Sequence, residues 1–288
     1  MAPLRRKCNG SIAVQINKGQ LIGFSKEVEG IVFPLEIDGA LESQIRKIQD
    51  NYEELSYPLG EQRKDQPIER KSYQTATINY YNSSSKEYIS STRSISLNSL
   101  YSKFRNSGSF RGGIPRGGLI LDAGCGSGRD TRYFIQHGYR VVSFDASEEM
   151  VRSCLSYPFS YCIEHSFEQI DYLEEFDAVW ACASLLHLKE ADLKLAMERL
   201  YNALVPNGVI YFSLKNRPEH EGKDSDSRQF FYYEQASIES LCEELGLKKV
   251  EIWENTTRKQ NDTSTWVNYI YEKVKVYEGA LPPAIKVS

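Results

Sequence analysis

The sequence lacks the features that mark membrane proteins, exported proteins and strongly basic proteins. No stretch of its 288 residues approaches the ~18–20 consecutive apolar residues of a membrane-spanning helix. The basic residues near the N-terminus are not followed by the apolar segment of a signal peptide. The formal net charge of −4 excludes a basic field over the whole chain for nucleic acid or an anionic membrane. We therefore expect a soluble cytoplasmic protein that contacts no membrane.

Closely spaced cysteine pairs are also absent. The six cysteines form no CxxC motif, so the sequence predicts no bound metal, and a disulfide framework is not expected in a chain of this length. Several lie in apolar segments, which indicates reduced, buried thiols and again favours the cytoplasm. The cysteines are Cys8, Cys125, Cys154, Cys162, Cys182 and Cys242.

The N-terminal part of the chain has the pattern of a small β-rich module. Residues 11–37 alternate in the manner of strands, with NKGQ as a turn between the first two. A helical face follows, with apolar residues at spacings of three and four: Leu41, Ile45, Ile48, Tyr52 and Leu55. We interpret residues 1–57 as a β-rich module closed by this helix, and the polar residues 58–74, with two prolines, as a linker.

A second domain is predicted over residues 75–276, with 277–288 as a C-terminal tail. It starts with a helical pattern over 75–107, and apolar strands then alternate with helices, which is typical of βαβ units in a mainly parallel sheet. The last two strands are joined without a helix and should pair antiparallel. The expected strands are 119–123, 140–145, 161–165, 176–182, 209–214, 250–253 and 266–274, with helices over 190–204 and 234–245 among those between them.

The stretch LILDAGCGSGRDT, residues 119–131, carries most of the functional information. A buried strand runs directly into a turn containing three glycines, which permit positive φ and let a ligand approach the backbone. The spacing is GxGxG, not the GxGxxG of dinucleotide binders. Asp122 and Asp130 flank the turn and would repel a pyrophosphate, so the site suits a ligand that carries an ammonium group.

The next predicted strand, RVVSFD, ends at Asp145, where a carboxylate can accept hydrogen bonds from both hydroxyls of a ribose. Together these two strands and their acids resemble the motifs of the class I S-adenosylmethionine (SAM)-dependent methyltransferases, over about residues 75–275. The resemblance implies SAM as cofactor. It also implies an α/β fold with a Rossmann-like, seven-stranded, mostly parallel sheet whose last strand is antiparallel, here with the N-terminal module added.

The resemblance also implies which residues surround SAM. Ser166 stands where the family usually has an acid, and Met150 is equally compatible with a place in the core. An N-terminal helical segment with aromatic residues covers the SAM pocket in many small-molecule members, and Tyr80 and Tyr81 occupy such a segment here, although plain hydrophobic packing is the alternative. The implied set is Asp122, Gly124, Cys125 and Gly126 at the methionine end, Asp145 at the ribose, Ala146, Met150, Ser166 and Phe167 at the adenine, and Ala181 and Tyr81 in the pocket wall.

The stretch WACASLLHL, residues 180–188, brings Cys182, Ser184 and His187 within nine positions and suggests a nucleophile with its base. The strand order places it instead at the exit of the fourth strand, facing the sulfonium of SAM, and methyl transfer needs no covalent enzyme intermediate. We therefore interpret Cys182 as core and Ser184 as pocket wall that contacts the substrate. His187 remains a candidate general base, a residue that shapes the site, or a structural residue.

A long segment, residues 213–235, follows the fifth predicted strand and is a candidate substrate loop. Lys215 and Arg228 lie near four consecutive aromatic residues, an arrangement that can hold an anionic or planar acceptor. Tyr80 is assigned to the same substrate side. A solvated loop with an aromatic plug into the core is the alternative interpretation.

Three functional hypotheses follow. The first is SAM-dependent methyl transfer to a small-molecule acceptor, by an in-line SN2 displacement that leaves S-adenosylhomocysteine. The second is methylation of RNA or protein, with residues 1–57 presenting the target; the basic segment 102–118 is the local feature that favours nucleic acid, although the net charge does not support it. The third is a SAM-binding interaction or sensor protein without turnover. The sequence identifies neither the methyl acceptor nor the oligomeric state.

Overall fold

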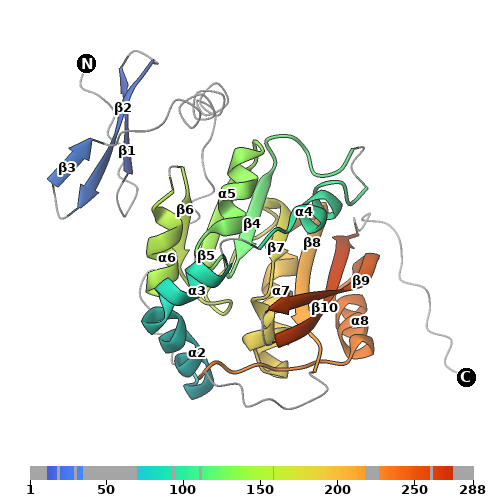
Figure 1. Cartoon of the computed structure of the whole chain (residues 1–288). Coiled ribbons are helices and arrows are strands. Elements are labelled where there is room, and N and C mark those ends of the chain that lie inside the picture. Colours follow the sequence, from blue (N-terminus) through green and yellow to red (C-terminus); the bar gives the residue numbers. More distant parts are fainter. Residues whose placement is uncertain are drawn as a thin grey trace, which may run out of the picture.

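A seven-stranded sheet forms the centre of the fold (Figure 1). The computed structural model describes residues 12–17, 20–28, 31–34, 70–92, 95–109, 112–157, 159–217, 227–259 and 262–274. The strands are β4 (Leu119–Ala123), β5 (Arg140–Asp145), β6 (Tyr161–Glu164), β7 (Phe176–Ala181), β8 (Leu204–Lys215), β9 (Leu247–Lys259) and β10 (Asp262–Lys273).

The strand order is β6-β5-β4-β7-β8-β10-β9, so the chain leaves the sheet centre at β4 in one direction and returns to fill the other side. The five strands from β6 to β8 are parallel to one another, and β10 is antiparallel to both β8 and β9. The predicted α/β fold, with its mostly parallel sheet and antiparallel end, is confirmed. The order reverses between β4 and β7, the place where such sheets bind ligands at their carboxyl ends.

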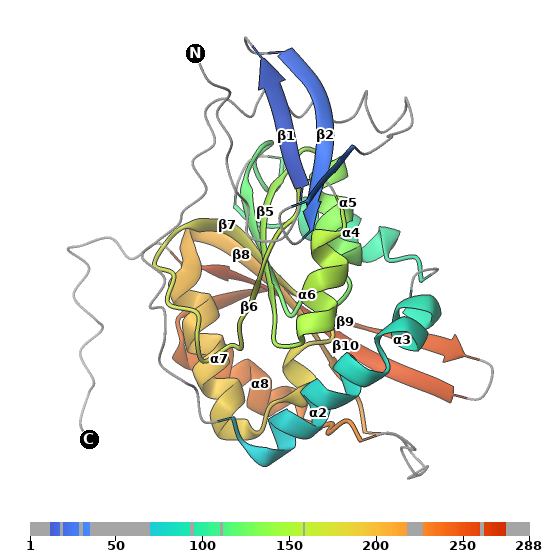
Figure 2. The same cartoon turned by 90° about the vertical axis from the view of Figure 1, so that its left-hand side faces the viewer.

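Helices cover both faces of the sheet (Figures 1 and 2). Alternate residues of a strand face opposite sides, so Leu121 packs with α7 and α8, whereas Ile120 packs with α4 and α5. Both side chains are fully buried, as expected for a central parallel strand. The helices are α2 (Ser72–Ser83), α3 (Ser85–Thr92), α4 (Asn98–Arg105), α5 (Arg129–Gln136), α6 (Glu148–Leu155), α7 (Glu190–Ala203) and α8 (Gln235–Glu244), with the 3₁₀ turn η1 (Leu185–His187).

Helices α2 and α3 run across one end of the sheet, as Figure 2 shows in teal. They pack over the carboxyl ends of the parallel strands, where their side chains line a pocket with those of the β4–α5 loop. This arrangement matches the helical pattern predicted for residues 75–107, although α2 begins earlier, at Ser72. Among the described helices, none is both long and apolar enough to cross a membrane.

The N-terminal strands form a separate three-stranded antiparallel sheet. It consists of β1 (Ile12–Asn17), β2 (Gln20–Val28) and β3 (Ile31–Pro34), in that order. These strands fall within the alternating pattern of residues 11–37. The predicted closing helix, residues 58–69 of the predicted linker and the C-terminal tail lie outside the described residues, so the division into domains stays a prediction.

Candidate functional site

A pocket of about 1150 Å³, including the solvent-filled space at its mouth, opens at the carboxyl ends of β4, β5 and β7. Its floor is the glycine-containing loop after β4, and its roof is formed by α2 and α3. It is large enough for a ligand of nucleoside size. Ten of the residues predicted around SAM or at the catalytic position line it: Tyr81, Gly124, Cys125, Gly126, Asp145, Ala146, Met150, Ser166, Phe167 and His187. Ser184, predicted on the substrate side, lines it as well.

The glycine loop has a backbone that other residues could not adopt without strain. Gly124, Gly126 and Gly128 have φ values of +74°, +53° and +77°. A Cβ atom on Gly124 would lie 2.4 Å from the Cβ of Ser184. The Ser184 hydroxyl donates to the carbonyl of Ala123 at 2.8 Å, so this serine fixes the exit of β4 against the exit of β7.

Asp145 is held at the end of β5 by two backbone donors. The amide of Gly126 donates to its Oδ2 at 2.8 Å, and the amide of Ser147 donates to its Oδ1 at 2.9 Å. Burial raises the pKa of Asp145 to about 6, against the lowering effect of these hydrogen bonds. Each carboxylate oxygen can accept a further hydrogen bond from the pocket, as a ribose diol requires.

Asp122 lies behind the loop and does not line the pocket. Its side chain is 1% exposed, and it accepts a hydrogen bond of 2.6 Å from the hydroxyl of Thr131, which also contacts Ser143. Burial, together with the nearby charge of Asp130, raises the pKa of Asp122 well above its usual value. Asp122 was predicted at the methionine end, but its side chain does not contact the pocket in this structure. Through Thr131 it connects β4 to α5 and β5 by hydrogen bonds.

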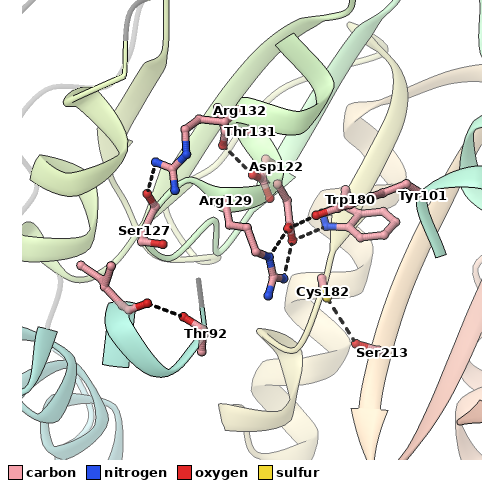
Figure 3. Close-up of polar contacts among 12 residues, drawn as sticks. Thr92, Tyr101, Asp122, Ser127, Arg129, Thr131, Arg132, Trp180, Cys182 and Ser213 are labelled. Carbon is pink, nitrogen blue, oxygen red and sulfur yellow. Dashed lines mark hydrogen bonds and ion pairs between the residues drawn. The ribbon is translucent and has the colours of Figure 1, made fainter. Parts of the chain in front are cut away.

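Arg129 follows the glycine loop and lines the pocket, a residue that the sequence reasoning missed. Its guanidinium forms two hydrogen bonds with Asp130, from Nε at 2.6 Å and from Nη2 at 3.1 Å. Asp130 also accepts from the hydroxyl of Tyr101 at 2.6 Å and the indole of Trp180 at 2.8 Å. Figure 3 shows these donors directed at the same carboxylate. Burial would raise the pKa of Asp130, but Arg129 and the other donors outweigh it and hold the pKa low.

The side of the pocket beyond β5 is largely apolar. Met150 is 1% exposed and belongs to the core as well as to the pocket wall. Phe167 packs edge-on against Phe144, with ring centroids 5.2 Å apart. Ser166 has its hydroxyl and its amide directed at the side chain of Gln169, at 3.2 and 2.8 Å.

His187 joins the pocket roof to the exit of β7. Its Nδ1 lies 2.7 Å from the carbonyl of Gln229, and its Nε2 lies 3.0 Å from the hydroxyl of Tyr81. Since a carbonyl only accepts, Nδ1 carries the proton in the neutral ring, and Nε2 accepts from Tyr81. Burial raises the pKa of Tyr81 and keeps the phenol neutral. The two side chains form a hydrogen-bonded pair that faces the pocket.

Cys182 packs against the core, as predicted, but it also lines the pocket. Strand β7 ends at Ala181, which is fully buried and outside the pocket lining, so the chain turns at Cys182 and brings this half-buried side chain to the pocket wall. Burial raises the pKa of its thiol to about 12, which leaves it protonated and argues against a nucleophile. Ala183, next in the turn, has a φ of +55°, a conformation uncommon for a residue with a side chain.

Ser184 is the one predicted substrate residue in the pocket lining, whereas Tyr80, Lys215 and Arg228 lie beside the pocket. The Arg228 guanidinium stacks over three rings, with its carbon 4.6 Å from the centroid of Tyr80, 5.0 Å from Phe230 and 5.8 Å from Tyr81. Lys215 lies 5.3 Å from the centroid of Phe230. Because Phe230 also contacts the ring of His187, at 5.0 Å, this group adjoins the pocket at the His187 side.

Sequence spacing gave no signal for one further cluster. Cys125, Cys154 and Cys162 come from three separate elements, and their sulfur atoms all lie within 4.8 Å of one another.

Other pocket-lining residues that the sequence left unassigned include Gln74, Tyr88, Thr92, His165 and Glu168, because their elements meet the pocket only through the tertiary fold.

Comparison with known proteins finds methyltransferases among the similar sequences. Residues 120–208 match the family model of a methyltransferase domain. An uncharacterized methyltransferase of Synechocystis sp. is 29% identical over 109 residues, which are 37% of this chain and 51% of the relative. A malonyl-[acyl-carrier protein] O-methyltransferase of Salmonella typhimurium is 31% identical over 96 residues, 33% of this chain and 38% of the relative. The chain thus spans about half or less of the length of these curated relatives.

Two solved structures share the fold. Magnesium protoporphyrin IX methyltransferase of Synechocystis with bound SAM superposes with a TM-score of 0.53 at 17% identity, over 71% of this chain and 99% of the other. Phosphoethanolamine N-methyltransferase 2 of Haemonchus contortus superposes with a TM-score of 0.52 at 18% identity, over 71% of this chain and 59% of the other. These superpositions show that the chain shares the fold of the two methyltransferases.

Proposed function

We propose that this protein transfers the methyl group of SAM to a small-molecule acceptor. The observation that carries the proposal is the single pocket that brings together the glycine loop, the carboxylate of Asp145 and the Tyr81–His187 pair. The first two features suit a nucleoside, and the third supplies a proton acceptor at the other end. The glycine loop, Asp145 and His187 follow β4, β5 and β7, and Tyr81 comes from α2. Open α/β sheets bind their ligands at this edge, which supports the proposal.

The residues present fit SAM from end to end. Asp145 would accept both ribose hydroxyls, and Ala146, Met150 and Phe167 would enclose the adenine. The methionine carboxylate would meet Arg129, whose guanidinium is already oriented by its paired hydrogen bonds to Asp130. Because Gly124 and Gly126 have no side chains, the backbone of the loop can approach the ligand closely. This assignment moves the methionine end from Asp122 to Arg129.

In the proposed reaction, the main contribution of the protein is to align the acceptor with the methyl group. SAM supplies an electrophilic methyl group, whose bond to the acceptor forms as the electrons of the carbon–sulfur bond pass to sulfur. The enclosed pocket holds the acceptor lone pair behind the methyl group and excludes water, which is worth several orders of magnitude in rate. Where the acceptor carries a proton, the Nε2 lone pair of His187 would take it, directly or through the hydroxyl of Tyr81.

The group around Arg228 indicates an acceptor with a negative charge or a planar ring. A guanidinium against three aromatic rings forms a rigid surface that pairs with anions and stacks on flat groups. Lys215 adds a second positive charge next to Phe230. We assign this surface, together with Ser184, to the acceptor side of the site.

We also propose that the protein is cytoplasmic, since the described cysteines are all unpaired.

Release of S-adenosylhomocysteine tests the proposal. The purified protein is incubated with SAM and a cell extract, and the extract is used untreated, after nuclease, after protease and after removal of macromolecules by filtration. We expect turnover in all four, including the low-mass filtrate, and none with Asp145→Ala. Turnover that disappears with nuclease or protease would show an RNA or protein acceptor presented by residues 1–57. Tight SAM binding without turnover in any fraction would show a sensor.

A further inference from the structure

Three buried thiols converge beside the glycine loop. Cys125 belongs to the loop between β4 and α5, Cys154 to α6 and Cys162 to β6. The Sγ atoms of Cys125 and Cys162 are 3.5 Å apart, and all three sulfur atoms lie within 4.8 Å of one another. The residues are 8%, 0% and 5% exposed, respectively.

The surrounding packing fixes the three sulfur atoms in place. A Cβ atom on Gly128 would lie 2.7 Å from the sulfur of Cys154 and 2.9 Å from its Cα, so α6 rests directly on the loop. Val151 and Leu155 cover the cluster from α6. The apolar residues around the cluster and the short side chain of cysteine restrict the directions in which the thiols can point. This restriction favours a preorganised set of ligands.

The spacing suits a metal ion bound by three thiolates. Zinc–thiolate bonds of about 2.3 Å place sulfur atoms of one coordination shell roughly 3.8–4.0 Å apart. The distances here, from 3.5 Å to at most 4.8 Å, bracket that value, so side-chain shifts within about 1 Å complete the shell. Cys125 also lines the pocket, which gives an ion and a water molecule a path to the cluster.

We propose that Cys125, Cys154 and Cys162 bind one divalent thiophilic ion of the zinc group, Zn²⁺ or Cd²⁺. Three sulfur–metal bonds form and three thiol protons are released, with no change of oxidation state. Water from the pocket completes the tetrahedral shell, as at zinc sites with three protein ligands. Since Cys125 lies between Gly124 and Gly126, the bound ion fixes the loop that forms the pocket floor. The site is chemically separate from methyl transfer.

Titration of the reduced, metal-free full-length protein with cadmium chloride tests the site. The sulfur–cadmium charge-transfer absorption should rise to saturation at one ion per chain, with release of protons measured in weak buffer. Cys125→Ala and Cys162→Ala should each weaken binding by more than about 100-fold, because loss of a direct ligand exceeds the 10–100-fold typical of outer-shell partners. Zinc chloride should compete with cadmium for the same site.

Cys182→Ala and Cys242→Ala are the matched controls, since these thiols lie outside the cluster. They should bind cadmium as tightly as the unmodified chain. Circular dichroism establishes that each variant is folded, and the edge-strand variant Cys162→Ala keeps the test valid if changes in the loop disturb folding. Absence of a saturable absorption band, or equal losses in the control variants, would overturn the proposal.

Discussion

The carboxylate of Asp145 predicts a specific pH dependence of SAM binding. Burial raises its pKa to about 6. Both oxygens already accept backbone hydrogen bonds, from Gly126 and Ser147, and in the proposed complex both also accept a ribose hydroxyl. Protonation converts one acceptor into a donor, so SAM should bind the ionised form.

The magnitude follows from linkage. If only the ionised form binds, the apparent Kd increases by the factor 1 + 10^(pKa − pH), which is about 1.1 at pH 7, about 2 at pH 6 and about 11 at pH 5. The affinity should therefore fall about tenfold from pH 7 to pH 5, or about 1.4 kcal/mol. The stability of the folded protein without SAM depends on pH in the opposite direction. Between about pH 4 and 6 the folded state holds a proton on Asp145 that the unfolded state has released, so Asp145 makes the protein without SAM less stable as pH rises through that window.

Calorimetric titration with SAM from pH 5 to pH 8 measures the effect. Asp145→Asn is the control, because an amide cannot titrate; its weaker binding should be independent of pH over the same range. A Kd that stays constant between pH 5 and pH 7 would refute the reasoning. So would an unchanged pH profile in the asparagine variant, since another group would then be responsible.

Three further substitutions test other parts of the site. Gly124→Ala should weaken SAM binding by at least about tenfold, because its Cβ meets Ser184 and its φ is positive; adding Ser184→Gly should restore part of the affinity in calorimetry, and no recovery would exclude the clash as the cause. His187→Asn should lower turnover by about 100-fold or more with an unchanged Kd for SAM, whereas normal turnover across pH 6–9 would remove its role as a base. Asp130→Asn should lower the free energy of unfolding in urea by about 3–5 kcal/mol, because the partly buried guanidinium of Arg129 loses its partner; a loss below about 1 kcal/mol would contradict this.

The parts of the site that follow directly from local sequence were predictable. The glycine loop and Asp145 each come at the end of an apolar strand, and parallel strands bring their carboxyl ends to one edge of the sheet. Helices α7 and α8 were likewise predictable from their apolar periodicity. Such features depend on a few consecutive residues.

Features that depend on which side of a strand faces the ligand were not predictable. Asp122 lies within β4, and the sequence does not tell whether its side chain points to the pocket or back toward Thr131, where the structure has it. Cys182 reaches the pocket because β7 ends one residue earlier than the apolar pattern suggests. A strand pattern fixes alternation, but not the end of the strand or the assignment of its faces.

The cysteine cluster could not be predicted from the sequence. Its members are 29 and 8 residues apart along the chain, and they meet only because β6 is placed next to β5 and α6 packs on the glycine loop. Strand order is a property of the whole sheet, so no local motif reports it. Arg129 is different: it directly follows the glycine turn, and its position at a helix N-terminus near the pocket could have been noted.

A crystal structure of the protein with S-adenosylhomocysteine tests the central claim most directly. The account predicts the ribose hydroxyls at both oxygens of Asp145, the adenine against Phe167, the carboxylate at Arg129 and the sulfur directed toward the Tyr81–His187 pair. A ligand bound outside this pocket, or bound in it with the ribose away from Asp145, would contradict the account.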